Sequence, residues 1–206
     1  MRSTKKNSLA RFLAEWGIFS LIIIGFLLSR LFIWQPVSVD GHSMDPTLHD
    51  KERLIMARTT TIDRFDIVVA SEVDSQGKEK LIVKRVIGMP GDSIRFENDV
   101  LYINEEVVDE PYLAEYLAAF KEDKLQSTYS YNKSFQNRAA AATAFTLDAN
   151  GYPSLSYVVP EGHYFLMGDD RLVSLDSRNV GPFTKANIKG EVVFRMWPLN
   201  RIGTVK

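Results

Sequence analysis

The chain contains no cysteine, carries little net charge and has only three histidines. Without cysteine it has no thiol nucleophile, no disulfide and no thiolate zinc site, so redox chemistry does not indicate its compartment. Its 25 basic and 26 acidic residues give a net charge of −1 and are scattered, without the positive patch that nucleic-acid binding requires. Composition therefore excludes thiol catalysis and argues against a nucleic-acid partner.

One long apolar run is present, from Gly17 to Trp34. As a helix it would extend about 27 Å, close to the hydrocarbon thickness of a bilayer. Basic residues precede this run, and the positive-inside tendency then puts the N-terminus in the cytoplasm. We therefore predict a basic cytoplasmic segment at 1–16, a transmembrane anchor at 17–34 and an extracellular domain at 35–206.

A cleaved secretory signal is the alternative interpretation of the same segment, since a basic start and an apolar stretch fit one. Cleavage of such a signal requires small residues near its end, whereas the residues from Ser29 to Pro36 are mostly bulky. The sequence therefore favours an uncleaved, single-pass anchor in the cell membrane.

The remaining residues, about 170, suffice for one domain with a core and a small appended lobe. Short β-branched and apolar runs bounded by turns predict strands at 37–39, 53–57, 66–70, 80–87, 93–97, 100–104, 157–167 and 191–197. The texture changes between 110 and 156, where helical spacing is followed by a Ser, Asn and Ala-rich stretch. The predicted fold is mostly β: an antiparallel β-sheet catalytic domain with 110–156 as an inserted smaller lobe, preceded by one transmembrane helix.

Ser43 lies in the segment Gly41 to Leu48, two residues after a glycine and three before a proline. The backbone there can turn sharply and expose the hydroxyl, so Ser43 is either an ordinary turn residue or a nucleophile. A serine hydroxyl becomes a nucleophile only when a neighbouring base takes its proton. The interpretation of Ser43 therefore depends on finding that base.

The three histidines, His42, His49 and His163, are weak candidates for the base. Neighbouring side chains in an extended segment point in opposite directions, which counts against His42. No carboxylate stands in an obvious orienting relation to any of the three, and Pro46 interrupts a helix that could stack Asp45 on His49. We therefore expect no histidine base and no histidine metal ligand.

Lys84 is more informative, because in a strand it shares one face with Ile82 and Val86. Burial between them would penalise the ammonium form and lower the pKa of the lysine, which is how lysine becomes a base near neutral pH. Arg85 stays charged when buried and so needs a carboxylate partner. The loop Gly168–Arg171 supplies candidates.

Three segments together resemble the bacterial type I signal peptidases, most closely the short, single-span form of Gram-positive bacteria and of streptococci in particular. They are Gly41 to Leu48, Lys84 to Asp92, and Gly168 to Arg171 continuing to Arg178. The resemblance implies a membrane-bound serine endopeptidase that removes signal peptides from exported preproteins after a small-x-small pattern, through an acyl-enzyme. It implies preproteins and the lipid bilayer as partners and no metal or other cofactor, and it leaves the oligomeric state open.

The same resemblance assigns roles to individual residues. Ser43 matches the nucleophile, Lys84 the general base and Ser174 the residue that orients the lysine. Two structural ion pairs are implied, Arg85 with Asp169 and Asp176 with Arg178. The cleft would be lined by Val37, Val39, Asp40, Met44, Ile82 and Val83.

Gly41 departs from the Gram-negative pattern, in which a serine at this position helps to bind the oxyanion. The amide of Ser43 remains available as a donor, and close backbone approach at Gly41 offers either a second amide or room for water.

Two interpretations from other classes remain open. A self-cleaving regulator of the SOS-repressor type uses a similar serine and lysine, but it would carry a DNA-binding helical domain where this chain has an apolar run. A catalytically idle, membrane-anchored β-module would use Lys84 as a structural cation only.

Overall fold

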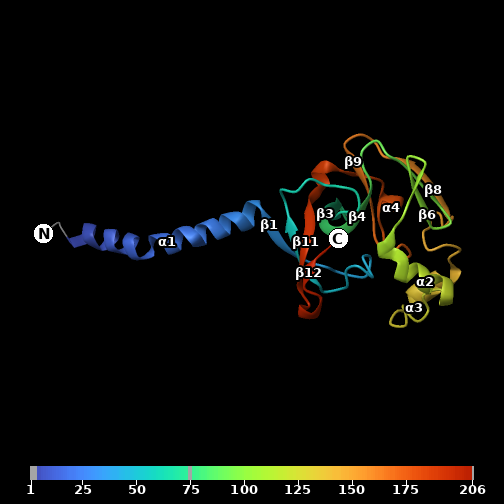
Figure 1. Cartoon of the computed structure of the whole chain (residues 1–206), viewed down its shortest axis with the longest axis horizontal. Helices are drawn as coiled ribbons and strands as arrows, with labels where there is room; N and C mark the ends of the chain where they lie inside the picture. The colour runs from blue at the N-terminus through green and yellow to red at the C-terminus, as the bar shows by residue number, and fades with distance from the viewer. Residues whose placement is uncertain (1–3, 74–75, 206) are drawn as a thin grey trace.

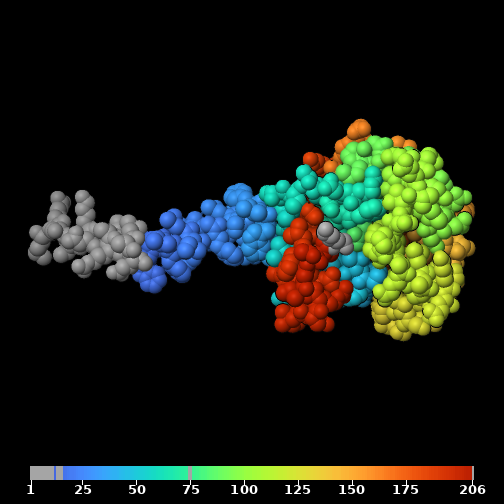
Figure 2. Space-filling view, viewed as in Figure 1, coloured from blue at the N-terminus to red at the C-terminus, as the bar shows by residue number. Residues whose placement is uncertain are grey.

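The computed structural model describes residues 4–73 and 76–205, with side chains at residue 12 and from residue 16 onward in those ranges. Of the basic segment predicted at 1–16, residues 1–3 lie outside the described residues, and for most of the others the backbone alone is described. Helix α1 runs from Thr4 to Phe32, and its described part stands clear of the body of the molecule (Figures 1 and 2). In the part of the chain that is described, no helix has the length and hydropathy needed to cross a membrane. The anchor at 17–34 thus stays a prediction.

Eight strands form the larger sheet, in the order β1-β2-β11-β3-β4-β9-β10 with β12 paired to β11. Every pair in it is antiparallel. The strands are β1 Trp34–Ser38, β2 Arg53–Ala57, β3 Ile67–Val73, β4 Glu79–Gly88, β9 His163–Met167, β10 Phe183–Thr184, β11 Ile188–Trp197 and β12 Gly203–Thr204. The predicted mostly β, antiparallel domain is confirmed.

A second antiparallel sheet has the order β7-β6-β5-β8. Its strands are β5 Ser93–Glu97, β6 Val100–Ile103, β7 Glu106–Val108 and β8 Ser154–Val158. Asn98 and Asp99 join β5 to β6 with φ of 48° and 68°, the positive values that a two-residue hairpin turn requires. The two strands that it joins correspond to those predicted at 93–97 and 100–104.

A helical segment is inserted between β7 and β8, at the end of the molecule away from α1 (Figure 1). We call residues 111–147 the helical lobe. It contains the 3₁₀ turn η1 Pro111–Leu113, α2 Ala114–Asp123 and α3 Lys133–Ala141. The side chain of Asn132 caps α3 by accepting from the amides of Ser134 and Phe135.

The predicted lobe at 110–156 overlaps this segment, but its last residues belong to β8. The prediction of one strand at 157–167 is wrong, because β8 ends at Val158 and β9 begins at His163. Pro160 and Gly162, whose φ is +71°, break the run between them. The short helix α4 Ser177–Val180 follows the loop after β9. The remaining 3₁₀ turns are η2 Lys185–Asn187 and η3 Leu199–Arg201.

Separate apolar cores fix these parts. Met44 and Leu48 are buried with Leu54 and Val192 in the core beneath β1, β2 and β11. The helical lobe has its own core, to which Leu172 from the loop after β9 contributes. The segment containing Ser43 and the loop after β9 are therefore each held by a packed core.

Candidate active site

The segment that carries Ser43 leaves β1 and turns back toward β2. Gly41 has a φ of +89°, a value that a residue with a side chain rarely adopts. Met44 and Leu48 are both buried, and the amide of Leu48 donates to the carbonyl of Met44 at 2.8 Å. The nucleophile candidate thus sits, half-buried, on a turn fixed by two apolar anchors.

Lys84 lies on β4 and reaches this turn from the sheet. Its Nζ donates a hydrogen bond to Ser43 Oγ at 2.7 Å, although the two residues are 41 positions apart. The lysine is only 4% exposed. The structure therefore brings together the two residues for which the sequence predicts nucleophile and base.

Burial lowers the pKa of Lys84 to about 8 because it penalises the ammonium form. The carboxylates of Asp176 and Glu72 oppose this shift, and the cation of Arg178 adds to it. Arg85 points to the other face of β4 and is neutralised there.

Asp169 receives two hydrogen bonds from Arg85, one from Nε at 2.9 Å and one from Nη2 at 2.6 Å. Both side chains are fully buried. Thr47 donates to the same carboxylate at 2.6 Å, and the ring of Tyr112 lies 3.9 Å from the guanidinium carbon. This network joins β4, the loop after β9 and the Ser43 segment.

Asp176 forms the second ion pair, with Arg178 Nε donating at 2.9 Å. It also accepts from the main-chain amide of Gly168 at 3.0 Å and caps α4. These contacts hold the pKa of its carboxyl below the usual value despite burial.

Ser174 Oγ is buried beside this pair and helps to lower the pKa of the Asp176 carboxyl, whereas the hydrogen bond recorded for Lys84 Nζ goes to Ser43. The bond to Lys84 that the resemblance implies is therefore not made in this structure. Gly168 allows Ser174 and the Ser43 segment to approach each other closely. A Cβ at this position would lie only 2.3 Å from Ser174 Oγ and 2.4 Å from the carbonyl oxygen of Ser43.

A cleft of about 370 Å³ opens beside Ser43 and Lys84. Its lining includes five of the six residues predicted to bind substrate: Val39, Asp40, Met44, Ile82 and Val83. Val37 is the exception: it does not line the cleft, and it packs against the core that contains Met44 and Leu48. Glu72, Lys80 and Leu175 also line this cleft, and the resemblance did not indicate them.

A buried carboxylate that the sequence did not indicate lies beside two of the histidines. Asp45 is buried and contacts His42 Nδ1 at 2.9 Å and His49 Nδ1 at 2.7 Å. The prediction failed because 42–49 is a compact turn, neither extended nor helical. Neither ring has a recorded contact with Ser43 or Lys84, and the His42 ring packs instead 4.9 Å from that of Tyr131 in the helical lobe.

Gly41 does not supply a free amide for an oxyanion, because its N–H donates to Asp50 Oδ1 at 2.8 Å. Of the two amides considered from the sequence, only that of Ser43 therefore remains as a donor. Within the described residues there is also no group of three side chains placed to hold a metal ion.

Several residues that hold the Ser43 segment carry no local sequence signal. Glu52 is buried between Arg195 and Arg201, and both arginines also donate to the carbonyl of Thr47.

Asp170 also holds the Ser43 segment. It follows the predicted Asp169, and its amide lies 3.2 Å from the carbonyl oxygen of Ser43. Its carboxyl accepts from the hydroxyl of Tyr129, which lies 41 residues away.

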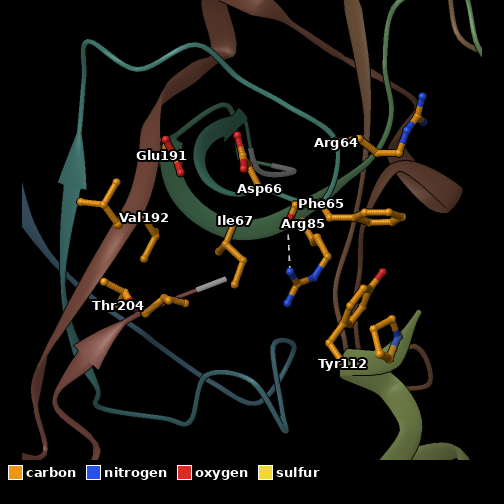
Figure 3. A pocket seen from close by; sticks show the side chains of 12 residues that line it. Arg64, Phe65, Asp66, Ile67, Arg85, Tyr112, Glu191, Val192 and Thr204 are labelled. Atoms are coloured by element: carbon orange, nitrogen blue, oxygen red, sulfur yellow. Dashed lines mark hydrogen bonds between the residues drawn. The ribbon is translucent and has the colours of Figure 1, made fainter. Parts of the chain in front are cut away.

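A larger cavity of about 640 Å³ lies on the Arg85 side of β4 (Figure 3). Arg85 and Tyr112 stand at one side of it, and Asp66 and Glu191 at another. Neither Ser43 nor Lys84 lines it, so it is separate from the cleft that contains them.

Comparison with known proteins agrees with the motifs. The signal peptidase family, peptidase S26, matches residues 13–197. The signal peptidase I of Streptococcus pneumoniae serotype 4 is 58% identical, over 96% of this chain and 99% of that protein. Signal peptidase I S of Bacillus subtilis is 38% identical, over 97% of this chain and 95% of that protein.

A solved signal peptidase I structure from Enterococcus faecalis is 29% identical and covers 65% of this chain and 97% of its own, with a TM-score of 0.43. The family match and the streptococcal relative span nearly the whole chain and agree with the resemblance inferred from the three motifs. The chain therefore belongs to the signal peptidase family, peptidase S26, as an enzyme of the signal peptidase I type.

Proposed function

We propose that this enzyme removes N-terminal signal peptides from exported preproteins, cutting after a small-x-small pattern with Ser43 as nucleophile and Lys84 as general base. The observation that carries the proposal is the 2.7 Å hydrogen bond between Lys84 Nζ and Ser43 Oγ. A lysine serves as a base only when its pKa falls toward neutrality, and burial lowers the pKa of Lys84 to about 8.

The reaction uses these two groups in turn. The neutral amine of Lys84 takes the Ser43 proton while Oγ attacks the scissile carbonyl carbon. The resulting ammonium then gives that proton to the leaving amine, and the C–N bond breaks to leave an acyl-enzyme. Water, activated by the same amine, hydrolyses the ester and restores Ser43.

The substrate-binding part of the proposal rests on an open strand edge. β4 pairs with β3 along Glu79–Arg85, whereas β9 pairs with β4 only from Arg85 onward. The opposite edge at 80–83 therefore has no partner strand among the described residues and borders the cleft. An extended signal peptide would add to this edge, with its small residues facing the cleft.

The supporting residues are proposed to hold this geometry. We assign Arg85 with Asp169, and Asp176 with Arg178, as structural ion pairs, and Ser174 as the neighbour that orients Lys84. We also propose that 17–34 anchors the enzyme in the cell membrane, with 1–16 in the cytoplasm and 35–206 outside. Exposed apolar side chains along the described part of α1 support the anchor.

The idle β-module remains as the second candidate, and the environment of Lys84 disfavours it. A buried structural cation is normally paired with a carboxylate. Within the described chain Lys84 forms no ion pair, and the only hydrogen bond recorded for its Nζ goes to Ser43. A buried ammonium without a carboxylate partner destabilises the folded state, so a purely structural role does not explain Lys84.

Cleavage of a preprotein by the full chain in detergent micelles tests the proposal. We expect Ser43→Ala and Lys84→Ala to abolish cleavage in folded protein. Ser156→Ala and Lys189→Ala are matched controls, because Ser156 is exposed on β8 and Lys189 pairs with Glu79 on the sheet, and both should cleave normally. A folded Ser43→Ala enzyme that still cleaves would reject the proposal.

A further inference from the structure

Asp170 touches the nucleophile segment through its main chain and the helical lobe through its side chain. Its amide donates to the carbonyl oxygen of Ser43 at 3.2 Å. Its Oδ1 accepts from the hydroxyl of Tyr129 at 2.6 Å, and both residues are completely buried. A two-bond connection therefore runs from the core of the helical lobe to the residue that carries the nucleophilic hydroxyl.

The surrounding packing leaves this connection little freedom. Gly168 has no room for a Cβ against the carbonyl of Ser43, so the loop is pressed onto the nucleophile segment. Leu172 is buried in the core of the helical lobe, and its carbonyl accepts from Arg138 Nη1 at 2.9 Å. A displacement of the lobe is thus transmitted to Ser43 through the loop.

The carboxyl of Asp170 keeps its proton to a higher pH than an exposed aspartate does. Burial raises the pKa of its carboxyl to about 7, and its second oxygen, Oδ2, has no hydrogen-bond partner in the described residues. The Tyr129 hydroxyl and the backbone amides of Val173 and Leu172 act against this rise in the pKa. The Tyr129 hydroxyl is the side-chain contact that fixes it.

We propose that Tyr129 and Asp170 are positioning residues that set the distance between Ser43 and Lys84 from the helical lobe. The proposal rests on the proposed function, because it assigns a role in the reaction of that dyad. It gives the helical lobe a task in catalysis although none of its residues lines the cleft.

The expected loss of cleavage rate follows from the 2.7 Å distance between Lys84 Nζ and Ser43 Oγ, which proton transfer requires to be kept. A misplacement of 1 Å between reacting groups costs up to about 100-fold in rate. Loss of one hydrogen bond that still leaves the packing intact should cost less, so we expect about a 10-fold fall in kcat. KM should change little, because the cleft lining is untouched.

The test compares five variants of the full chain in detergent micelles. Tyr129→Phe removes the donor, Asp170→Ala removes the acceptor, and Tyr129→Phe/Asp170→Ala removes both. Asp170→Asn keeps an acceptor oxygen of the same shape. Tyr116→Phe is the matched control, because Tyr116 is buried in the same core, 6.2 Å from the Tyr129 ring, and no hydrogen bond of its hydroxyl is recorded in the described structure.

We expect Tyr129→Phe, Asp170→Ala and the double variant to lose kcat by the same factor, with KM within about twofold of the parent. Asp170→Asn and Tyr116→Phe should remain near the parent. The proposal is overturned if Tyr129→Phe keeps the kcat of the parent, if it falls no further than Tyr116→Phe, or if the losses in the double variant multiply. If Asp170→Ala does not fold, the ratio between Tyr129→Phe and Tyr116→Phe decides.

The proposed function is judged separately, by cleavage with the parent and its loss in Ser43→Ala. A parent that cleaves through Ser43, together with an unaffected Tyr129→Phe, rejects only the positioning role.

Discussion

Lys84 and Arg85 are adjacent cations in one strand, and the fold treats their charges in opposite ways. Lys84 is buried and forms no ion pair with any residue that the structure describes, so its ammonium form is disfavoured and its pKa falls to about 8. Arg85 is buried against a carboxylate that accepts two of its N–H groups. Guanidinium does not deprotonate in proteins, so only the lysine is suited to act as a base.

The pH dependence of cleavage should therefore follow the deprotonation of Lys84. The amine must be neutral to accept the Ser43 proton, and with a pKa of about 8 only about one amine in ten is neutral at pH 7. Activity should rise about tenfold per pH unit below that pKa and level off above it. Initial rates of preprotein cleavage across pH 5 to about 10 check this.

Two substitutions separate the lysine from the histidines in that profile. Lys84→Arg should be inactive, because guanidinium keeps its proton throughout this range. His42→Ala should keep the midpoint of the rising limb, since the His42 ring contacts Asp45 and Tyr131 and has no recorded contact with the dyad. A limb that moves or vanishes in folded His42→Ala would contradict the assignment of Lys84.

Asp170 should make folding stability fall as pH rises. Its pKa is raised from 3.8 to about 7, so between these values the unfolded chain has released a proton that the folded chain still binds. The folded state then loses stability as pH rises from about 4 to about 7, by an amount on the order of 3 kcal/mol. Asp170→Asn should lack this slope. Denaturant unfolding of the full chain in micelles at several pH values measures it.

Other groups near Asp170 do not mimic that slope. Asp45 faces it from the nucleophile segment, and Tyr116, Tyr129 and Tyr131 face it from the helical lobe. Burial raises the pKa of all three tyrosines, so they stay neutral in this range, and Asp45 titrates in parent and variant alike. An unchanged slope in Asp170→Asn would show that Asp170 is ionised in the fold at low pH.

The pair between Arg85 and Asp169 ties β4 to the loop after β9. Asp169→Ala would leave the Arg85 guanidinium buried without its partner, at a cost of about 3–5 kcal/mol in the free energy of unfolding. Glu105→Ala is the matched control, because Glu105 is exposed in its pair with Arg95 and such pairs contribute about 0–1 kcal/mol. Denaturant unfolding compares the two. An Asp169→Ala protein that unfolds like the parent while activity disappears would show that the pair serves chemistry instead.

The sequence predicted the elements that carry a local pattern. The strand β4 could be predicted because β-branched and apolar residues surround Lys84 and Arg85, and neighbouring residues of a strand point to opposite faces. Ser43 stands out because glycine and proline flank it. By contrast, the contact between Tyr129 and Asp170 depends on how a helical lobe docks, and nothing near either residue signals it. The contacts of Asp45 with two histidines were missed because a compact turn has neither of the two periodicities that pattern arguments use.

The whole molecule separates an apolar helix from a polar β-domain. In the described part of α1 the large apolar side chains, such as Ile18, Leu21 and Phe32, are exposed and have no protein core to enter. Contiguous apolar surface of this kind marks contact with a membrane or another protein. Ser43 and Lys84 lie in the β-domain, and the proposed topology would place that domain outside the cell, where it meets exported preproteins.

The absence of cysteine makes this topology directly measurable. Asn150 is exposed next to the helical lobe, so Asn150→Cys should react with a membrane-impermeant thiol reagent on intact cells. Ser3→Cys, on the basic side of the apolar run, should react only after lysis, because the positive-inside tendency keeps that end in the cytoplasm. The parent chain is the blank, and both variants should stay in the membrane fraction after high-salt washing, since a span, unlike a surface contact, is not released by salt. Labelling of Ser3→Cys on intact cells, or release of either variant by salt, would contradict a single span with the dyad outside.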